Sequence, residues 1–206
     1  MSHFSVAVVV PNETYKKGEV YIKDYIQDLL DPFSEHLEVE PYKNPCYTCK
    51  GTKINALEYS KNFGKPCDEE DCDENGEYTT TYNPKSKWDW YRIGGRWNGE
   101  IVNNVPVSTD NGFNFGADCE SLELNSISIN KLLETRYERY VSESNPDGVF
   151  SPFAILTPES DWIEHGKMGW WAIVSDKTSD EEWNEITKAV FNRYKNEYAV
   201  LLDCHI

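Results

Sequence analysis

Residues 38 to 84 constrain the fold most, because they interrupt an otherwise periodic chain and contain four of its six cysteines. The stretch is rich in Pro, Cys, Asp, Glu and Gly and has neither helical nor strand periodicity. This composition predicts an irregular insertion within a single domain of residues 1 to 206. A chain of 206 residues is long enough for one domain with such an insertion.

The four cysteines of this insertion have the spacing of metal ligands. Cys46 and Cys49 form a C-x-x-C pair, and Cys67 and Cys72 follow. Paired thiolates hold zinc tetrahedrally, and four of them leave no position for a catalytic water. The sequence therefore predicts a structural zinc. The run Cys46-Tyr-Thr-Cys49-Lys-Gly51 resembles half of a DnaJ-type C-x-x-C-x-G zinc module, although the four residues between Cys67 and Cys72 depart from it. The alternative is a loop of unrelated thiols.

Outside the insertion, apolar periodicity alternates between strand and helix. A capping box of Ser179 and Glu182 marks the start of the last helix. The order of elements favours an α+β fold, with a mainly antiparallel sheet, helices on one face and a ferredoxin-like core as the specific hypothesis. The predicted elements are a strand over 4–10, a helix over 22–33, a hairpin over 88–97, a helix over 127–141, strands over 152–157, 162–165 and 169–175, a helix from 180, and a strand over 199–206.

The chain is strongly acidic, with a formal net charge of −16. This charge argues against general double-stranded DNA binding, which needs a basic surface, and permits a basic partner or mimicry of a polyanion. No apolar run approaches the roughly 20 residues of a membrane span, and the first residues lack the pattern of a signal peptide. We therefore expect a cytoplasmic protein.

The segment from Lys85 to Trp97 gathers aromatic and basic side chains in a chain that is poor in bases. Strand alternation predicts Trp88, Trp90 and Arg92 on one face, and a two-residue turn at Gly94-Gly95 would place Arg92 opposite Trp97. Such a surface can stack a nucleobase and bind a phosphate or carboxylate. The alternative is that the Trp side chains belong to the core and the Arg side chains pair with acids. The predicted ligand contacts are Trp88, Trp90, Arg92, Arg96 and Trp97.

Three short motifs resemble a family of uncharacterised bacteriophage and prophage proteins. They are the N-terminal Met-Ser-His-Phe strand, the run Lys-Trp-Asp-Trp-Tyr-Arg-Ile-Gly-Gly-Arg-Trp at 87–97, and Met-Gly-Trp-Trp at 168–171. The resemblance implies a viral origin and carries over no site residues. It leads us to expect an accessory protein that binds a host protein or a small anionic or nucleotide ligand, with a role in host takeover or counter-defence.

A polar cluster is predicted where the two ends of the chain meet. If the first and last strands are antiparallel neighbours, His3 lies near His205, and Asp203 shares a face with His205 by alternation. Histidine beside aspartate forms a general base with an orienting carboxylate, or an open metal site. His165, beside Glu164, is a further catalytic candidate. The alternative for these residues is that they are ordinary surface histidines.

Two alternatives to the binding function also stay open. The protein is a small enzyme acting on a nucleotide or phosphate compound, or it is an acidic nucleic-acid mimic.

Overall fold

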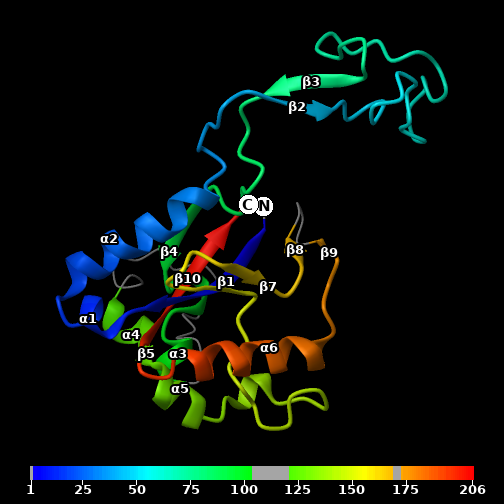
Figure 1. Ribbon diagram of the computed structural model, residues 1–206. Coiled ribbons are helices and arrows are strands. Elements are labelled where there is room, and N and C mark those ends of the chain that lie inside the picture. Colours follow the sequence, from blue (N-terminus) through cyan, green and yellow to red (C-terminus); the bar gives the residue numbers. More distant parts are fainter. Residues whose placement is uncertain (1, 104–120, 169–172) are drawn as a thin grey trace. The chain divides into compact units, whose positions relative to one another are not determined.

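A computed structural model describes residues 2–103, 121–168 and 173–206 of the chain. It divides into two compact units, one of Met1–Ser34 with Lys87–Ile206 and one of Glu35–Ser86 (Figure 1). The second unit spans the predicted insertion. No helix among the described residues has the length and apolar character needed to cross a membrane.

A six-stranded sheet forms the centre of the first unit, in the order β4-β10-β1-β6-β7, with β5 also paired to β10. All neighbouring strands are antiparallel except β1 and β6, which are parallel. The α+β class and the mainly antiparallel sheet are thus confirmed. The strands are β1 (His3–Val10), β4 (Trp90–Ile93), β5 (Ser126–Ser128), β6 (Ala154–Leu156), β7 (Trp162–Glu164) and β10 (Tyr198–His205).

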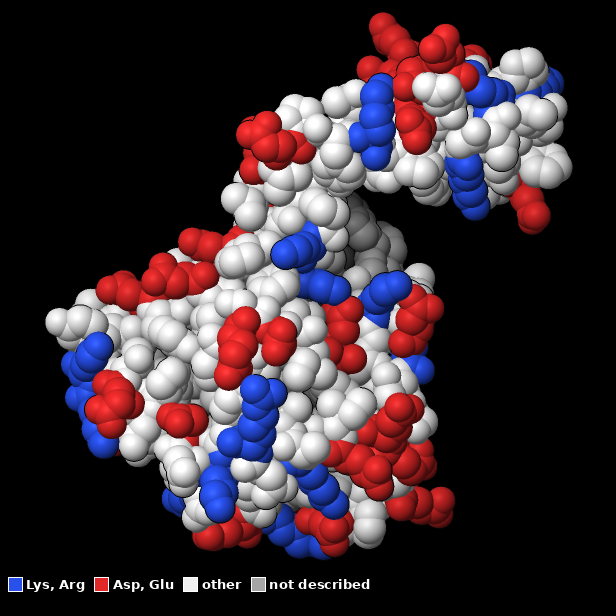
Figure 2. All heavy atoms as spheres, in the orientation of Figure 1, with Lys and Arg blue, Asp and Glu red and all other residues white. Residues whose placement is uncertain are grey.

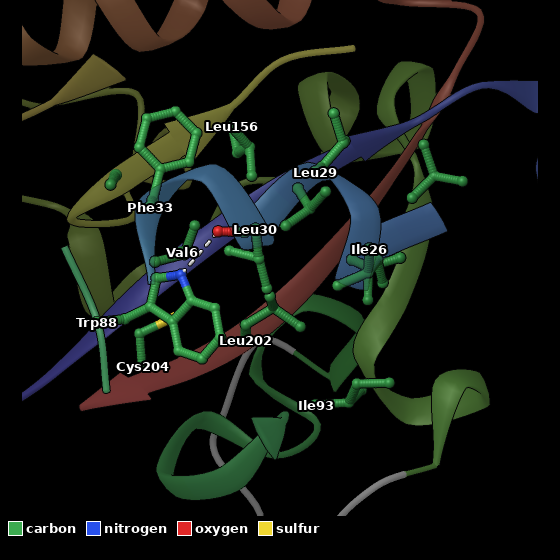
Figure 3. Close-up of a cluster of buried hydrophobic side chains, with 14 of the residues drawn as sticks. Val6, Ile26, Leu29, Leu30, Phe33, Trp88, Ile93, Leu156, Leu202 and Cys204 are labelled. Atoms are coloured by element: carbon green, nitrogen blue, oxygen red, sulfur yellow. Dashed lines mark hydrogen bonds between the residues drawn. The ribbon is translucent and has the colours of Figure 1, made fainter. Parts of the chain in front are cut away.

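Helices cover both faces of this sheet, so the prediction of helices on one face is wrong. Val6 and Val8 of β1 pack with α2 (Glu19–Leu30), as Figure 3 shows for Val6. Ala7 and Val9 face the opposite way and pack with α6 (Asp180–Arg193). The reason lies in β1 and β10, which are buried at nearly every position and therefore present an apolar side chain to each face. A ferredoxin-like core is excluded by these opposed helices and by the parallel β1–β6 pair.

The two long helices form where the sequence predicts them, although α2 begins and ends three residues before the predicted range of 22–33. In α2, apolar side chains at helical spacing are buried, and Pro32 lies in the short 3₁₀ helix η1 (Asp31–Phe33) that follows. At the start of α6, the Ser179 side chain accepts a hydrogen bond of 3.2 Å from the Glu182 backbone amide. The shorter helices are α1 (Asn12–Tyr15), α3 (Glu100–Asn103) and α4 (Leu122–Asn125).

The predicted helix over 127–141 is wrong. The segment instead contains strand β5, a helix of six residues, α5 (Ile129–Glu134), and the 3₁₀ helix η4 (Glu138–Tyr140). Strand β5 forms because its backbone pairs with β10, which outweighs the local helical periodicity. The predicted strand over 169–175 is described only at its end, where β9 (Val174–Ser175) pairs with β8 (Lys167–Met168). Residues 169–172, including Trp170 and Trp171, lie outside the described part of the chain.

The predicted hairpin over 88–97 is also wrong. Strand β4 pairs with β10, and Gly94 and Gly95, both at positive φ, lead into the 3₁₀ helix η2 (Gly95–Trp97) instead of a returning strand. Arg92 consequently lies opposite Asp203 and not opposite Trp97. The chain bends at Asp89, which places Trp88 on the α2 side of the sheet. There Trp88 is buried and donates a 3.1 Å hydrogen bond to the carbonyl of Leu30 (Figure 3).

The second unit has little regular structure. Its two strands, β2 (Tyr42–Pro45) and β3 (Glu77–Thr80), form an antiparallel ladder. Between them the chain follows an irregular path through the four cysteines, held by backbone hydrogen bonds such as that from the Cys46 amide to the Gly76 carbonyl at 2.8 Å. Gly76 has positive φ, and a Cβ atom there would overlap the Gly51 backbone, so the two loops that carry the cysteines approach closely.

Candidate functional site

The central strand β10 brings two of the predicted sites together, because it pairs with β1 on one side and with β4 on the other. His205 lies opposite both His3 and Trp90. One pair further along, Asp203 lies opposite Ser5 and Arg92. These two rows lie on the face of the sheet that α6 covers further along, since Asp203 and Ser5 are each two residues from Leu201 and Ala7 of that core and therefore point the same way. The histidines predicted from the chain ends and the Trp90–Arg92 strand thus form one cluster, which we call the histidine pair site.

The first half of the histidine pair site is a hydrogen-bonded pair of His3 and Asp203. The His3 Nδ1 lies 2.8 Å from Oδ1 of Asp203, and both side chains are less than one-tenth exposed. The second oxygen, Oδ2, accepts a hydrogen bond of 3.0 Å from the Arg96 backbone amide. A Cβ atom at Gly95 would overlap the Asp203 side chain, so the close approach of η2 to this carboxylate needs glycine at that position.

The second half repeats the arrangement with His205 and Asp89. The His205 Nδ1 lies 2.7 Å from Oδ1 of Asp89, and the same oxygen accepts a bond of 2.7 Å from the Trp90 amide. The Asp89 amide donates back to the His205 carbonyl at 3.0 Å. Because of this local ring of hydrogen bonds the chain bends at Asp89 and turns its carboxylate toward His205. The sequence reasoning missed Asp89, since regular alternation would have placed it on the opposite face from Trp90.

The two imidazoles are in contact with each other and with an indole ring. The His3 and His205 ring centroids are 4.9 Å apart in an edge-to-face arrangement, and Trp90 stacks on His205 at 4.9 Å. The Nε2 atom of His205 is buried and has no hydrogen-bond partner among the described residues. A buried nitrogen in this state has an unused donor or acceptor position, which a ligand could fill.

This arrangement defines what the two histidines can do chemically. A carboxylate that accepts a hydrogen bond from Nδ1–H fixes the tautomer of each ring and leaves Nε2 as the reactive nitrogen. Two such rings side by side can work as a general base and a general acid on one substrate. The pair site therefore contains the parts of an acid–base catalyst, each with its own orienting carboxylate.

The predicted ligand contacts divide between the histidine pair site and the core. Trp90 belongs to the site, and the half-buried Arg92 has its guanidinium carbon 5.9 Å from the Trp90 ring centroid. Arg96 contributes its backbone amide to Asp203, and its side chain is exposed. Trp88 is part of the core on the α2 side, and Trp97 packs against the core on the α6 side.

His165 lies elsewhere in the first unit. Its ring stacks on Trp183 at 5.4 Å, and its Nε2 lies 3.0 Å from the Thr178 carbonyl and 3.3 Å from Asp180. Burial lowers the pKa of His165, and the nearby Lys177 lowers it further. The ring borders a polar cavity of about 210 Å³. The structure does not bring His165 together with His3, Asp203 and His205.

The four predicted cysteine ligands do converge, within the second unit. The Sγ atoms of Cys46, Cys49, Cys67 and Cys72 all lie within 4.8 Å of one another, so the group can hold a metal ion. The Sγ atoms of Cys46 and Cys67 are 3.8 Å apart, and those of Cys49 and Cys72 are 3.6 Å apart. A tetrahedral zinc with Zn–S bonds of about 2.3 Å separates its sulfurs by about 3.8 Å. The spacing therefore fits a tetrahedral tetrathiolate site.

Neighbouring groups favour the thiolate at Cys49, whereas burial and hydrogen bonds with the other thiols raise the pKa of Cys72 to about 12. Desolvation acts to raise the pKa of Cys49, but hydrogen bonds from the backbone amides of Lys53 and Gly51 outweigh it and lower this pKa to about 7. The Lys53 ammonium lies 3.4 Å from Sγ of Cys72. Of the other two cysteines, Cys204 is buried in the first unit, and Cys119 lies outside the described residues.

The chain matches no protein-family model, no curated protein and no solved structure.

Proposed function

We propose that the protein is a small enzyme that uses general acid–base catalysis on a phosphate ester, of which a nucleotide is the preferred class. The observation that supports this proposal is the meeting of two histidine–aspartate pairs, with ring centroids 4.9 Å apart, from three separate segments of the chain. A stable fold does not require buried ionisable groups in this number, and such groups cluster at functional sites.

The roles of the residues follow from their contacts. His3 and His205 take the positions of base and acid, with Nε2 as the atom that accepts or donates the proton. Asp203 and Asp89 hold the rings and stabilise the imidazolium that forms when a ring is protonated. Asp203 and Asp89 do not themselves exchange a proton with the substrate.

The preference for a phosphate ester comes from Arg92 and Trp90. In a chain with a net charge of −16, an anionic substrate is repelled by most of the surface, so a local guanidinium decides where it binds. Arg92 supplies that charge: it lies two residues along β4 from Trp90, on the same face, and opposite Asp203. A guanidinium matches the oxygens of phosphate with two parallel hydrogen bonds, and the Trp90 indole offers a stacking surface for a base.

A second candidate function is ligand binding without turnover, as expected for a phage accessory protein that acts on a host factor or a nucleotide in the host cytoplasm. The observation that favours it is the low exposure of the two histidine side chains, 8% for His3 and 5% for His205. A deeply enclosed pair suits a binding pocket as well as a reaction site. Polyanion mimicry has less support, because acidic and basic side chains are interspersed on the face drawn in Figure 2.

We also propose that the metal of the tetrathiolate site is zinc and that its role is structural. Four thiolates complete a tetrahedral shell, and zinc is the commonest ion in such sites. The second unit would be ordered around this ion, and the chemistry would belong to the histidine pair site of the first unit.

The proposed activity can be tested with ³¹P NMR on the purified full chain. The protein is incubated separately with nucleoside mono-, di- and triphosphates, a dinucleotide and a simple aryl phosphodiester. We expect at least one resonance to be converted to a product resonance, and the conversion to be lost in H3N. Conversion that persists in H3N would point to a contaminating enzyme. Shifted protein resonances around Trp90 without conversion would favour the binding function, and neither conversion nor shift would contradict both.

A further inference from the structure

The loop 47–66 of the second unit exposes three large aromatic side chains to solvent. Tyr47 is 68% exposed, Tyr59 77% and Phe63 55%. The hydroxyl groups of Tyr47 and Tyr59 are 3.0 Å apart, so these two rings lie beside each other. Exposure of an aromatic ring to water is unfavourable, and the packing of this unit does not require it. Several exposed rings in one loop therefore indicate an interaction surface.

The loop is held in a defined shape by its own backbone. The Ala56 amide donates to the Thr48 carbonyl at 2.8 Å, and the Gly64 amide donates to the Asn55 carbonyl at 3.0 Å. The Asn55 side chain is buried and accepts from the Leu57 amide. The Cys67 amide donates to the Lys53 carbonyl, so the end of the loop is tied to the cysteine cluster. The rings are therefore presented on an ordered support.

The same loop is basic, unlike the chain as a whole. Residues 47–66 contain four lysines and one acid, Glu58, whereas the whole chain has 20 Lys and Arg against 36 Asp and Glu. Lys53 is engaged with the cysteine cluster. Lys50, Lys61 and Lys65 are exposed. Lysines interleaved with exposed rings are the surface that single-stranded nucleic acids require, since the rings stack on bases and the ammonium groups contact phosphates.

We infer that loop 47–66 binds single-stranded nucleic acid, by stacking of bases on Tyr47, Tyr59 and Phe63 and by contact of phosphates with Lys50, Lys61 and Lys65. The inference is independent of the histidine pair site, because every residue that carries it belongs to the second unit. It is compatible with the net charge of −16. That charge disfavours non-specific binding of duplex DNA but does not prevent binding at a local basic site.

The acidic residues that follow the loop set the strength of this binding. Two of them have partners within the unit: Asp73 pairs with Lys43 at 2.7 Å, and Glu69 accepts from Thr48 at 2.7 Å. Asp68, Glu70 and Asp71 are exposed. Their charge repels a phosphate backbone, so their replacement by amides is expected to tighten binding.

The inference is tested by fluorescence anisotropy. The full, zinc-loaded chain is titrated into a labelled 12-nucleotide single strand of deoxythymidine. We expect saturable binding, with a matched duplex much weaker. The variant Y59A/F63A should bind at least roughly thirtyfold more weakly, since two stacked bases are lost with the two rings. The variant K61A/K65A should lower the slope of log affinity against log salt by about 1.4, from two phosphate contacts of about 0.7 each.

Matched controls separate stacking from charge and from the other site. Y21A removes an aromatic side chain that is 56% exposed in α2 and should leave binding unchanged. Y59F keeps the ring and should also bind normally. H165N, a first-unit variant outside the histidine pair site, should also leave binding unchanged. No binding of the single strand, or equal binding of polyglutamate, or an unaltered affinity in Y59A/F63A, would overturn the inference.

Discussion

Replacement of His205 by asparagine is expected to slow phosphate-ester turnover by roughly 10²- to 10⁴-fold, the usual contribution of a general acid or base. The amide group of asparagine occupies the place of Nδ1 and can still donate to Asp89, which now bonds to His205 at 2.7 Å. The variant therefore loses Nε2 and keeps the hydrogen bond that holds the strand end. The expected result is a fall in kcat with little change in KM, because Trp90 and Arg92 remain.

The matched control for this variant is H165N, at the histidine that stacks on Trp183 in another part of the first unit. H165N should retain the wild-type rate. The thermal midpoint of each variant is measured beside its rate. If H205N retains the wild-type rate, or loses rate only in proportion to the fraction of unfolded protein, His205 has no part in the chemistry.

Removal of the proposed zinc is expected to unfold the second unit and leave the first unit folded. Within Glu35–Ser86, all of which the structure describes, the only buried apolar residues are the ligands Cys46 and Cys49. A unit of this size without a hydrophobic core would depend on the proposed zinc, because structural zinc contributes about 10–16 kcal/mol of apparent binding free energy in small zinc domains. The first unit has two apolar cores of its own and should not need the ion.

Two-dimensional ¹H–¹⁵N NMR before and after chelation checks this expectation residue by residue. The resonances of 35–86 should collapse to random-coil positions, and those of β1 and β10 should stay in place. Elemental analysis should give one zinc per chain, with the C49S/C72S variant near zero and a C204A variant still at one. Dispersed resonances for 35–86 in metal-free protein would contradict the structural role, and a bound ion other than zinc would contradict the assignment.

The sequence predicted those features that depend on local pattern. Runs of apolar residues correctly predicted strands β1 and β10, and the Ser179 capping box correctly predicted the start of α6. The antiparallel pairing of the chain ends was enough to bring His3 beside His205. The convergence of four cysteines followed from their spacing alone.

The features that sequence reasoning missed depend on long-range pairing. Gly94-Gly95 is typical of a tight turn, but β4 pairs with the distant strand β10 from Trp90 to Ile93 and no returning strand follows the two glycines. The sequence predicted Trp88, Trp90 and Arg92 on one face. Because the chain bends at Asp89, Trp88 instead lies on the opposite face of the sheet from Trp90 and Arg92. Asp89 itself becomes a partner of His205 only through this bend.

The proposed joint action of His3 and His205 is tested most directly by turnover in H3N, H205N and the H3N/H205N double variant. Each is compared with wild type on the substrate found by ³¹P NMR. Two groups that act as acid and base in one step are strongly non-additive, because removal of either partner abolishes the concerted path. We predict that each single variant loses most of the activity and that the double variant is about as slow as the slower single variant. A double variant with wild-type turnover, or losses that multiply as for independent residues, would contradict the proposal that the two histidine–aspartate pairs form one catalytic unit.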